Sequence, residues 1–421
     1  MPSTPAPGAL PPARIRGAVR GTYIAFAGCG LAFSSWASRL PQVRDHLHLS
    51  PARLGLVLLA IAAGSLIALP LAGPLIHRAG TRNTVACMSL LLCVGLSTVA
   101  VGYPHGTLPV VVGLFLLGLG TGAWDVAMNV HGALVEKHLG RSIMSRFHAG
   151  YSLGTVAGAL IGAGMVALHV PVTVHLVLAA AVIALAVPWG TRSFLRDDAP
   201  LDDGPDEPAP APRGPLAAWR EPRTLLIGVF VLAFAFAEGT GNDWIGIATI
   251  DGYGTSALVG TLSFATFLAT MTLGRWFGPM LLDRHGRVPV LRVLAAFGIA
   301  GALLFVFAPA TPLAFLGTVL WGLGVSLGFP VGMSAGADEP RYAAGRVSVI
   351  ASIGYCAFLA GPPSIGLLAD HLTTLRALTS VAVLLGVAAL ITSAVTPPRG
   401  VVASSTVPRQ EPADHDSRTA S

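Results

Sequence analysis

The stretches His77-Arg78-Ala79-Gly80-Thr81-Arg82 and Asp283-Arg284-His285-Gly286-Arg287 decide the fold of this chain. Each stretch directly follows a long apolar segment, and the two lie about 206 residues apart, at equivalent places in two halves of the sequence. A hydrophobic chain that repeats itself in this way is typical of membrane proteins in which two bundles move against each other around a shared site.

The composition places most of the chain in lipid. Of its 421 residues, 53% are hydrophobic and 11% are charged, against about 25% charged residues in soluble domains. Apolar stretches of about 20 residues are long enough to cross a hydrocarbon core of roughly 30 Å. Such stretches run over residues 18–39, 53–76, 84–103, 108–130, 145–168, 171–191, 224–249, 255–281, 289–308, 312–335, 347–369 and 374–395. The sequence therefore predicts an all-α membrane protein with twelve transmembrane helices in two pseudo-symmetric six-helix bundles.

The polar segments divide the chain into five parts. Residues 192–222 are acidic and rich in proline without a helical period, so we expect a flexible linker there. Residues 1–17 and 397–421 have a similar polar character and are expected to be disordered tails. The two predicted bundles then cover residues 18–191 and 223–396.

The distribution of basic residues predicts the orientation. If both termini face the cytoplasm, all but four of the 26 Lys and Arg residues fall in cytoplasmic tails, loops and adjoining helix ends. The exceptions are Arg39, Arg44, Arg53 and Arg376. Short cytoplasmic loops collect basic residues, so we expect cytoplasmic termini and a multi-pass topology. The net charge of +6 then reflects topology rather than binding to nucleic acid.

The two halves align over more than the paired loops. With a shift of about 204 to 208 residues, several unusual features coincide in the same order. The matches pair Gly118-Leu119-Gly120 with Gly322-Leu323-Gly324, Gly150-Tyr151 with Gly354-Tyr355, Ile161-Gly162 with Ile365-Gly366, and Trp36 with Trp244. Their common order favours a duplication over chance in a glycine-rich chain.

At this point the sequence resembles the major facilitator superfamily, from about residue 18 to residue 396. In that family a G-x-x-x-D-R-x-G-R-R type loop follows helices two and eight. The second loop of this chain is close to that pattern, whereas the first has His77 in place of the acid. Segments 124–129, 147–152 and 354–363 resemble a bacterial inner-membrane branch. The resemblance implies a secondary active transporter of a small solute in the bacterial inner membrane, with the bilayer and protons as partners, no cofactor and a monomeric state.

The paired loops form a predicted cytoplasmic gate. Gly80 and Gly286 permit a tight turn with positive φ, and the arginines hold the helix ends at the interface. The gate motif comprises His77, Arg78, Gly80, Arg82, Asp283, Arg284, Gly286 and Arg287. By pseudo-symmetry Asp283 should approach the start of helix five near Ser142 and Arg146, an interaction of about 0.3 to 2 kcal/mol with the helix N-terminus.

Three ionisable residues within the expected helices are candidates for proton coupling. Such residues cost roughly 2.5 to 3.5 kcal/mol each in a membrane helix, so they usually face a bundle interior or an aqueous cavity. Glu238 is the first candidate, because its charged carboxylate is costly past the midplane. A permanently paired acid that bridges helices is the alternative. Asp125 and His148 are the others; Asp125 could instead form a helix-end ion pair, and His148 could be an interfacial histidine.

Polar and aromatic residues on the same helices are candidates for the substrate cavity. They are Trp36, Asn129, Tyr151, Ser152, Asn242, Trp244 and Tyr355. Asn129 shares one helix face with Gly118, Gly122 and Asp125, and the glycines on that face should let another helix approach. Each aromatic residue could equally serve packing or an interface belt. Arg275 we assign to the cytoplasmic end of its helix.

Other classes of protein find little support. The only lysine, Lys137, has no GxxxxGK[ST] context, which excludes an ATP-driven pump of that type. No HExxH, metal-spaced cluster or serine nucleophile motif is present, so we expect neither an enzyme nor a metal site. A drug/proton antiporter and a non-transporting membrane sensor stay as alternatives. The antiporter is less favoured because drug-efflux members usually have a G-P-x-x-G-G motif on helix five, and helix five of this chain lacks its proline. A glycine followed by proline is found on helix eleven instead, at Gly361-Pro362-Pro363.

The inequality of the two loops generates a prediction. With His77 in place of an acid, the latch at the start of helix eleven is weak when the imidazole is neutral and repulsive when it is charged, because Arg341 and Arg346 are near. We expect His77→Asp to shift accessibility labelling toward an outward-open state. An unchanged labelling pattern would show that His77 only occupies a solvated turn.

Overall fold

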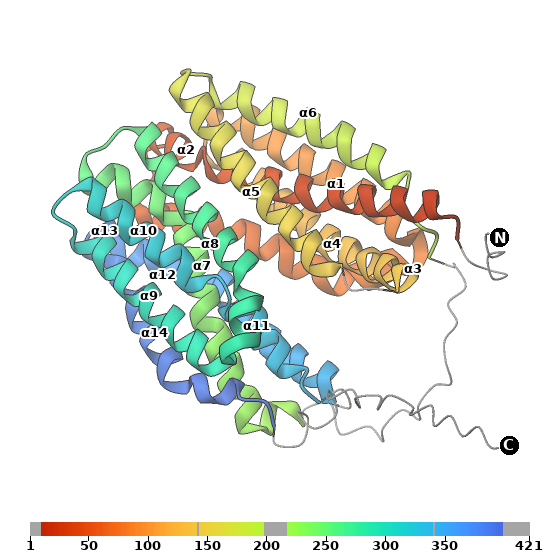
Figure 1. The fold of residues 1–421 in the computed structure, drawn as a ribbon. Coiled ribbons are helices and arrows are strands. Elements are labelled where there is room, and N and C mark those ends of the chain that lie inside the picture. The colour runs from red at the N-terminus through yellow and green to blue at the C-terminus, as the bar shows by residue number, and fades with distance from the viewer. Residues whose placement is uncertain (1–9, 141–142, 198–216, 340–341, 399–421) are drawn as a thin grey trace, which may run out of the picture.

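A computed structural model describes residues 10–140, 143–197, 217–339 and 342–398. All regular elements in these ranges are helices, and they form two bundles (Figure 1). The first bundle contains α1 (Pro12–Ala37), α2 (Leu40–His46), α3 (Pro51–Gly102), α4 (Thr107–Leu139), α5 (Met144–Ala167) and α6 (Val172–Thr191). The second contains α7 (Pro222–Tyr253), α8 (Ala257–His285), α9 (Arg287–Phe307), α10 (Thr311–Val325), α11 (Gly328–Gly336), α12 (Ala343–His371), α13 (Thr374–Ala377) and α14 (Thr379–Ile391). Short 3-10 turns are η1 (Tyr103–His105), η2 (Ala218–Arg220) and η4 (Thr392–Val395).

Ten helical stretches in the described ranges are long and apolar enough to cross a membrane. One of them, of 55 residues, contains α3 and is long enough for two crossings. Gly80 interrupts α3 with a φ of 77°, which a glycine adopts without strain. The two parts of α3 then lie against the same helix, because Gly118 of α4 contacts Ile61 and Gly120 contacts Met88. Together with α1, which has 26 residues, these helices fit the twelve predicted crossings.

Several boundaries differ from the prediction. Helix α1 begins at Pro12, inside the segment expected to be a tail, because proline is well suited to the first turn of a helix. Helix α4 continues to Leu139 rather than ending near residue 130. The tenth crossing is divided into α10 and α11 around Ser326 and Leu327. Most of the predicted linker and the C-terminal tail lie outside the described residues.

Glycines, which have no side chain, let the helices of each bundle approach closely. A Cβ on Gly154 of α5 would lie 2.2 Å from the carbonyl oxygen of Ala27 in α1, and one on Gly118 would lie 2.0 Å from that of Ile61. Large aromatic residues fill the interior around these contacts, and Trp124, Trp244 and Trp321 are fully buried. Close backbone contact in lipid replaces the hydrophobic driving force that packs helices in water.

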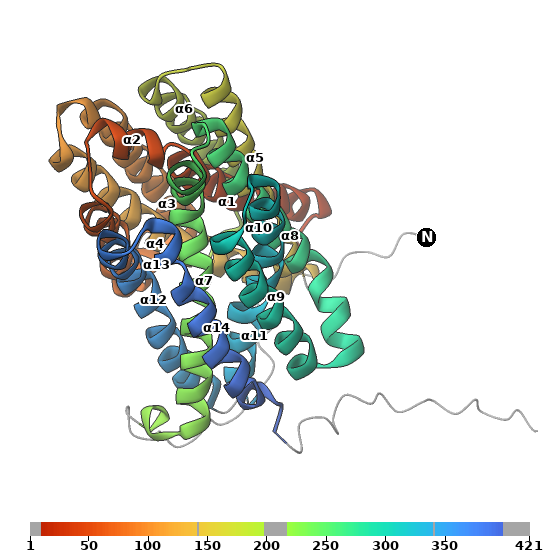
Figure 2. The ribbon, with the colours of Figure 1, turned by 90° about the vertical axis from the view of Figure 1, so that its left-hand side faces the viewer.

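The two bundles touch at one end and diverge at the other (Figure 1). Figure 2 shows the molecule from the end where they touch, with α2 of the first bundle above α13 of the second. Helix α3 packs against α12, and α5 packs against α8. We call the end with α2 and α13 the closed end. The other end carries the end of α6 and the start of α7, and we call it the linker end. The bundles are therefore joined mainly through their closed ends.

A pair of glycines on α5 tests this packing. Gly154→Ala places a methyl group against the α1 backbone, so we expect a loss of stability of about 1 to 3 kcal/mol. Gly164, on the same helix, has open space around its Cβ position, and Gly164→Ala should be neutral or slightly stabilising. Thermal unfolding in detergent measures both. Equal midpoints for the two variants would contradict the close contact.

Candidate functional site

An ion pair in the middle of the second bundle forms the centre of the site. Glu238 lies halfway along α7 and Arg275 lies two thirds of the way along α8. The Nη2 of Arg275 donates to both carboxylate oxygens of Glu238, each at 2.7 Å. Both side chains stay partly exposed, 15% for Glu238 and 27% for Arg275. Pairing offsets the cost of holding these charges within membrane helices, while their exposure leaves them reachable by solvent.

The division of the tenth crossing helps to hold Arg275. Its Nε donates to the carbonyl oxygen of Ser326 at 3.2 Å. Ser326 follows the last residue of α10, where carbonyl groups lose their partners within the helix. Gly274 lets the helices meet here, because a Cβ on it would lie 2.3 Å from the Ser326 hydroxyl. We expected Arg275 at the end of its helix, and this was wrong. Arg275 instead links α7, α8 and the break after α10.

The first bundle contributes a second carboxylate, Asp125, to this region. Asp125 lies in the middle of α4, because the helix extends further than predicted. The Nδ2 of Asn129 donates to its carboxylate at 3.3 Å and to its carbonyl at 2.9 Å. Gly118 and Gly122 on the same helix contact α3, as their spacing predicted. No ion pair between Asp125 and Arg146 is present among the described residues.

Charges from both bundles act on the same tyrosine. Asp125 of α4, together with Glu238 and Arg275, interacts electrostatically with the Tyr151 hydroxyl on α5. Arg275 also acts on His148, which lies one turn earlier on α5 and is exposed. These residues come from opposite bundles and lie near one another where α5 packs against α8, a region that we call the central space.

Other predicted cavity residues occupy different surroundings. Tyr355 of α12 is partly buried, interacts electrostatically with Asp125, and contacts the Phe358 ring. Trp36 and Trp244 are buried in the core, with exposures of 2% and 0%. Ser152 is also buried. A role for these three residues in substrate binding stays a prediction.

The space around Asn242 belongs to the closed end. Asn242 and its neighbour Asp243 line a crevice between α7, α8 and the junction of α1 with α2. The crevice has a volume of about 10 Å³, roughly the space for one water molecule. The Oδ1 of Asn242 has no hydrogen-bond partner in the described structure. This crevice is thus too small to admit a solute.

The paired loops at the linker end find partners within their own bundles. The backbone amide and hydroxyl of Thr81 each donate to Asp197 at 2.7 Å. Arg287 donates to Asp338 at 2.7 Å, and Arg223 donates to the other oxygen of Asp338 at 2.8 Å. These acids lie in segments that the sequence offered as linker or loop, so no motif marked them.

The predicted latch between Asp283 and helix five is not formed by the described residues. His77, Arg78, Asp283 and Arg284 are exposed. Ser142, expected near Asp283, lies outside the described residues. Arg346, which we expected to face the first loop, bonds instead to Glu221 at 2.6 Å and to Glu339 at 3.0 Å. The charges at the linker end therefore stabilise each bundle separately.

Charged groups at the closed end join the two bundles. Arg44 of α2 makes a two-point ion pair with Asp251 of α7, in which its Nη2 donates at 2.9 Å and its Nη1 donates to the second oxygen. Asp45 accepts a further bond from the Nε of Arg44 at 2.8 Å. Asp370 of α12 accepts from the backbone amide of Ala52 at 3.2 Å, at the positive N-terminal end of α3.

Comparison with known proteins matches these features. The family model for the Major Facilitator Superfamily matches residues 22–362. The chain is 31% identical over 362 residues to the uncharacterized transporter y4wD of Sinorhizobium fredii, covering 84% of this chain and 92% of that protein. It is 31% identical over 377 residues to an uncharacterized MFS-type transporter of Yersinia pestis, covering 89% and 95%.

Solved structures share the fold at low identity. A bacterial homolog of the human lysosomal transporter Spinster, inward-facing and unoccupied, gives a TM-score of 0.75 at 12% identity, covering 92% of this chain and 98% of that one. The nucleoside transporter NupG gives a TM-score of 0.70 at 14% identity, covering 90% and 98%. At these identities the likeness concerns the fold alone.

The contact between Arg44 and Asp251 is testable by exchanging the charges. In a chain without its four cysteines, Ser38→Cys reports access to the crevice, since Ser38 is buried there. We expect Arg44→Ala to raise labelling by an impermeant thiol reagent severalfold, and the double exchange Arg44→Asp with Asp251→Arg to restore protection. Arg376→Ala, at an exposed residue of the same end, is the control. Persistent labelling in the double exchange would rule out pairing as the cause.

Proposed function

This chain belongs to the Major Facilitator Superfamily and functions in membrane transport, and on that premise we propose a secondary active transporter that works by alternating access and is coupled to protons. The single observation that carries the proposal is the partly exposed ion pair of Glu238 with Arg275. It lies midway along two membrane helices, in a space that side chains of the other bundle also face.

The proposed orientation places the linker end in the cytoplasm of a bacterial cell. Loops at this end carry the two gate motifs and most of the basic residues, as the positive-inside rule requires. The described conformation is then inward-facing, because the bundles join at the closed end and diverge at the linker end (Figure 1). Nothing in the mechanism needs a second copy, so we propose a monomer.

Glu238 and Arg275 supply a proton-dependent binding group. While Glu238 is charged, its two oxygens occupy Nη2 of Arg275. Protonation of Glu238 weakens this pair and releases guanidinium donors for oxygen atoms of a solute. Asp125 and His148 are further proton sites in the same space, and their charge sets how strongly Arg275 is held.

The polar groups in this space suit a small hydrophilic solute. Tyr151 and Tyr355 offer hydroxyls alongside the guanidinium of Arg275, while the amide of Asn129 donates to Asp125. A metabolite with several hydroxyl or carboxylate oxygens can use these donors together. An apolar drug, the substrate of the alternative efflux function, would form fewer hydrogen bonds with these donors.

Flux in proteoliposomes tests the proposal. Purified protein is reconstituted with an imposed proton gradient and assayed for uptake and efflux against a panel of metabolites and drugs. We expect gradient-driven flux of a polar solute by the wild type and its loss in Glu238→Gln, because the amide neither carries a proton nor pairs with Arg275 in the same way. Exchange of solute without a gradient should decline less.

Two further variants separate coupling from structure. The exchange Glu238→Arg with Arg275→Glu keeps an ion pair, so it should restore stability without restoring proton-driven flux. Glu339→Gln removes a paired carboxylate outside the site and should leave coupling unchanged. Full recovery of flux in the double exchange would make the pair a structural bridge only. Absence of flux with every compound would favour a sensor instead.

A further inference from the structure

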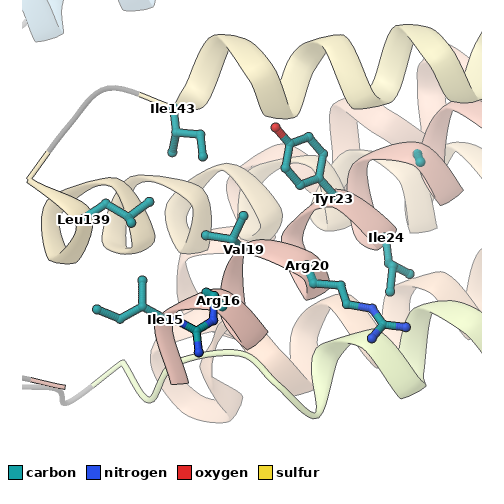
Figure 3. A pocket seen from close by; sticks show the side chains of 9 residues that line it. Ile15, Arg16, Val19, Arg20, Tyr23, Ile24, Leu139 and Ile143 are labelled. Carbon is teal, nitrogen blue, oxygen red and sulfur yellow. The ribbon is translucent and has the colours of Figure 1, made fainter. Parts of the chain in front are cut away.

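A groove on the outer side of the first bundle is separate from the transport site. It runs along α1 and is closed on one side by Leu139 at the end of α4 and Ile143 before α5 (Figure 3). Its volume is about 540 Å³. The walls are mainly apolar, formed by Ile15, Val19 and Ile24 among others. An apolar groove of this kind accommodates hydrocarbon.

Two arginines provide the polar part of the groove. Arg16 and Arg20 lie one helical turn apart on α1, and both are exposed. None of the nine lining residues is acidic. Glu136, on α4, is held by the backbone amides of Ile143 and Met144, each at 2.7 Å. The groove therefore presents positive charge above an apolar channel.

The length of the groove along α1 corresponds to the thickness of one leaflet of a bilayer. The guanidinium of Arg20 stacks on the Trp189 ring at 4.9 Å, and that ring is 48% exposed at the end of α6. An exposed tryptophan at the end of an apolar helix marks the membrane interface. From Arg16 to Ala27 the helix rises about 17 Å, close to half of a hydrocarbon core of roughly 30 Å.

We propose that this groove binds an anionic phospholipid. Its phosphate lies between Arg16 and Arg20, and one acyl chain follows α1 toward Ala27. Basic pockets between membrane helices on the cytoplasmic side bind anionic headgroups by the same physics. Naming the leaflet as cytoplasmic rests on the proposed orientation, whereas the binding itself does not depend on the transport mechanism.

Lipid binding to the purified full chain tests the proposal. Delipidated protein is titrated with phosphatidylglycerol or with phosphatidylcholine of the same acyl chains, and binding is followed by native mass spectrometry and thermal unfolding. We expect selective retention of phosphatidylglycerol, and about tenfold weaker retention in Arg16→Gln with Arg20→Gln. Arg220→Gln with Arg292→Gln removes two exposed charges at the linker end of the other bundle and should bind like the wild type.

Two more measurements separate a lipid from a free anion. Val19→Phe narrows the channel and keeps both arginines, so it should weaken retention of phosphatidylglycerol. Inorganic phosphate at millimolar concentration should not displace the lipid. Equal retention by the Arg16 and Arg20 double variant, equal binding of phosphatidylcholine, or displacement by phosphate alone would each overturn the proposal. These outcomes leave proton-coupled flux untouched, so a failure here does not affect the proposed function.

Discussion

The ion pair between Arg44 and Asp251 joins the two bundles at the closed end. The two residues are 207 positions apart, within the offset at which the halves of the sequence repeat. Two equivalent residues that face each other lie beside the axis relating the halves, so this contact joins the bundles where their symmetry brings them together. Asp370 adds a second acid at the start of α3. These contacts hold the bundles together at the closed end, as the proposed inward-facing state requires.

The duplicated frame carries an unequal set of charges. The shift of 208 residues that pairs Trp36 with Trp244 places Gly30 opposite Glu238, and the loop shift of 206 residues places Leu69 opposite Arg275. The first bundle therefore has no counterpart of the ion pair. The shift of 204 residues that pairs Gly118 with Gly322 places Phe329 opposite Asp125. The glycines that allow helices to approach repeat in both halves, whereas the charged residues of the central site do not. Helix packing therefore follows the duplication, whereas the charged residues of the site are distributed unequally between the two bundles.

The sequence predicted the bundle architecture well because apolar length and glycine spacing act locally. The turns at Gly80 and Gly286 have the positive φ that was expected of them. Partners across helices were harder to predict, because they depend on how helices rotate against each other. Arg275 was assigned to a helix end, but its carboxylate partner is 37 residues away on α7. Asp197 and Asp338 were missed because they lie in segments that resemble ordinary polar loops.

The proposed coupling follows from the sum of charges in the central space. Glu238 and Arg275 cancel each other, so a charged Asp125 leaves one net negative charge when His148 is neutral. Closing the bundles around a net charge is costly, because water is then excluded from it. One proton removes this cost, whether it resides on Asp125 or on Glu238. The Nη1 group of Arg275 has no hydrogen-bond partner among the described residues, so it can donate to a solute without breaking the ion pair. A neutral solute would therefore travel with one proton, whereas a cationic solute would take the place of the proton and make the exchange an antiport.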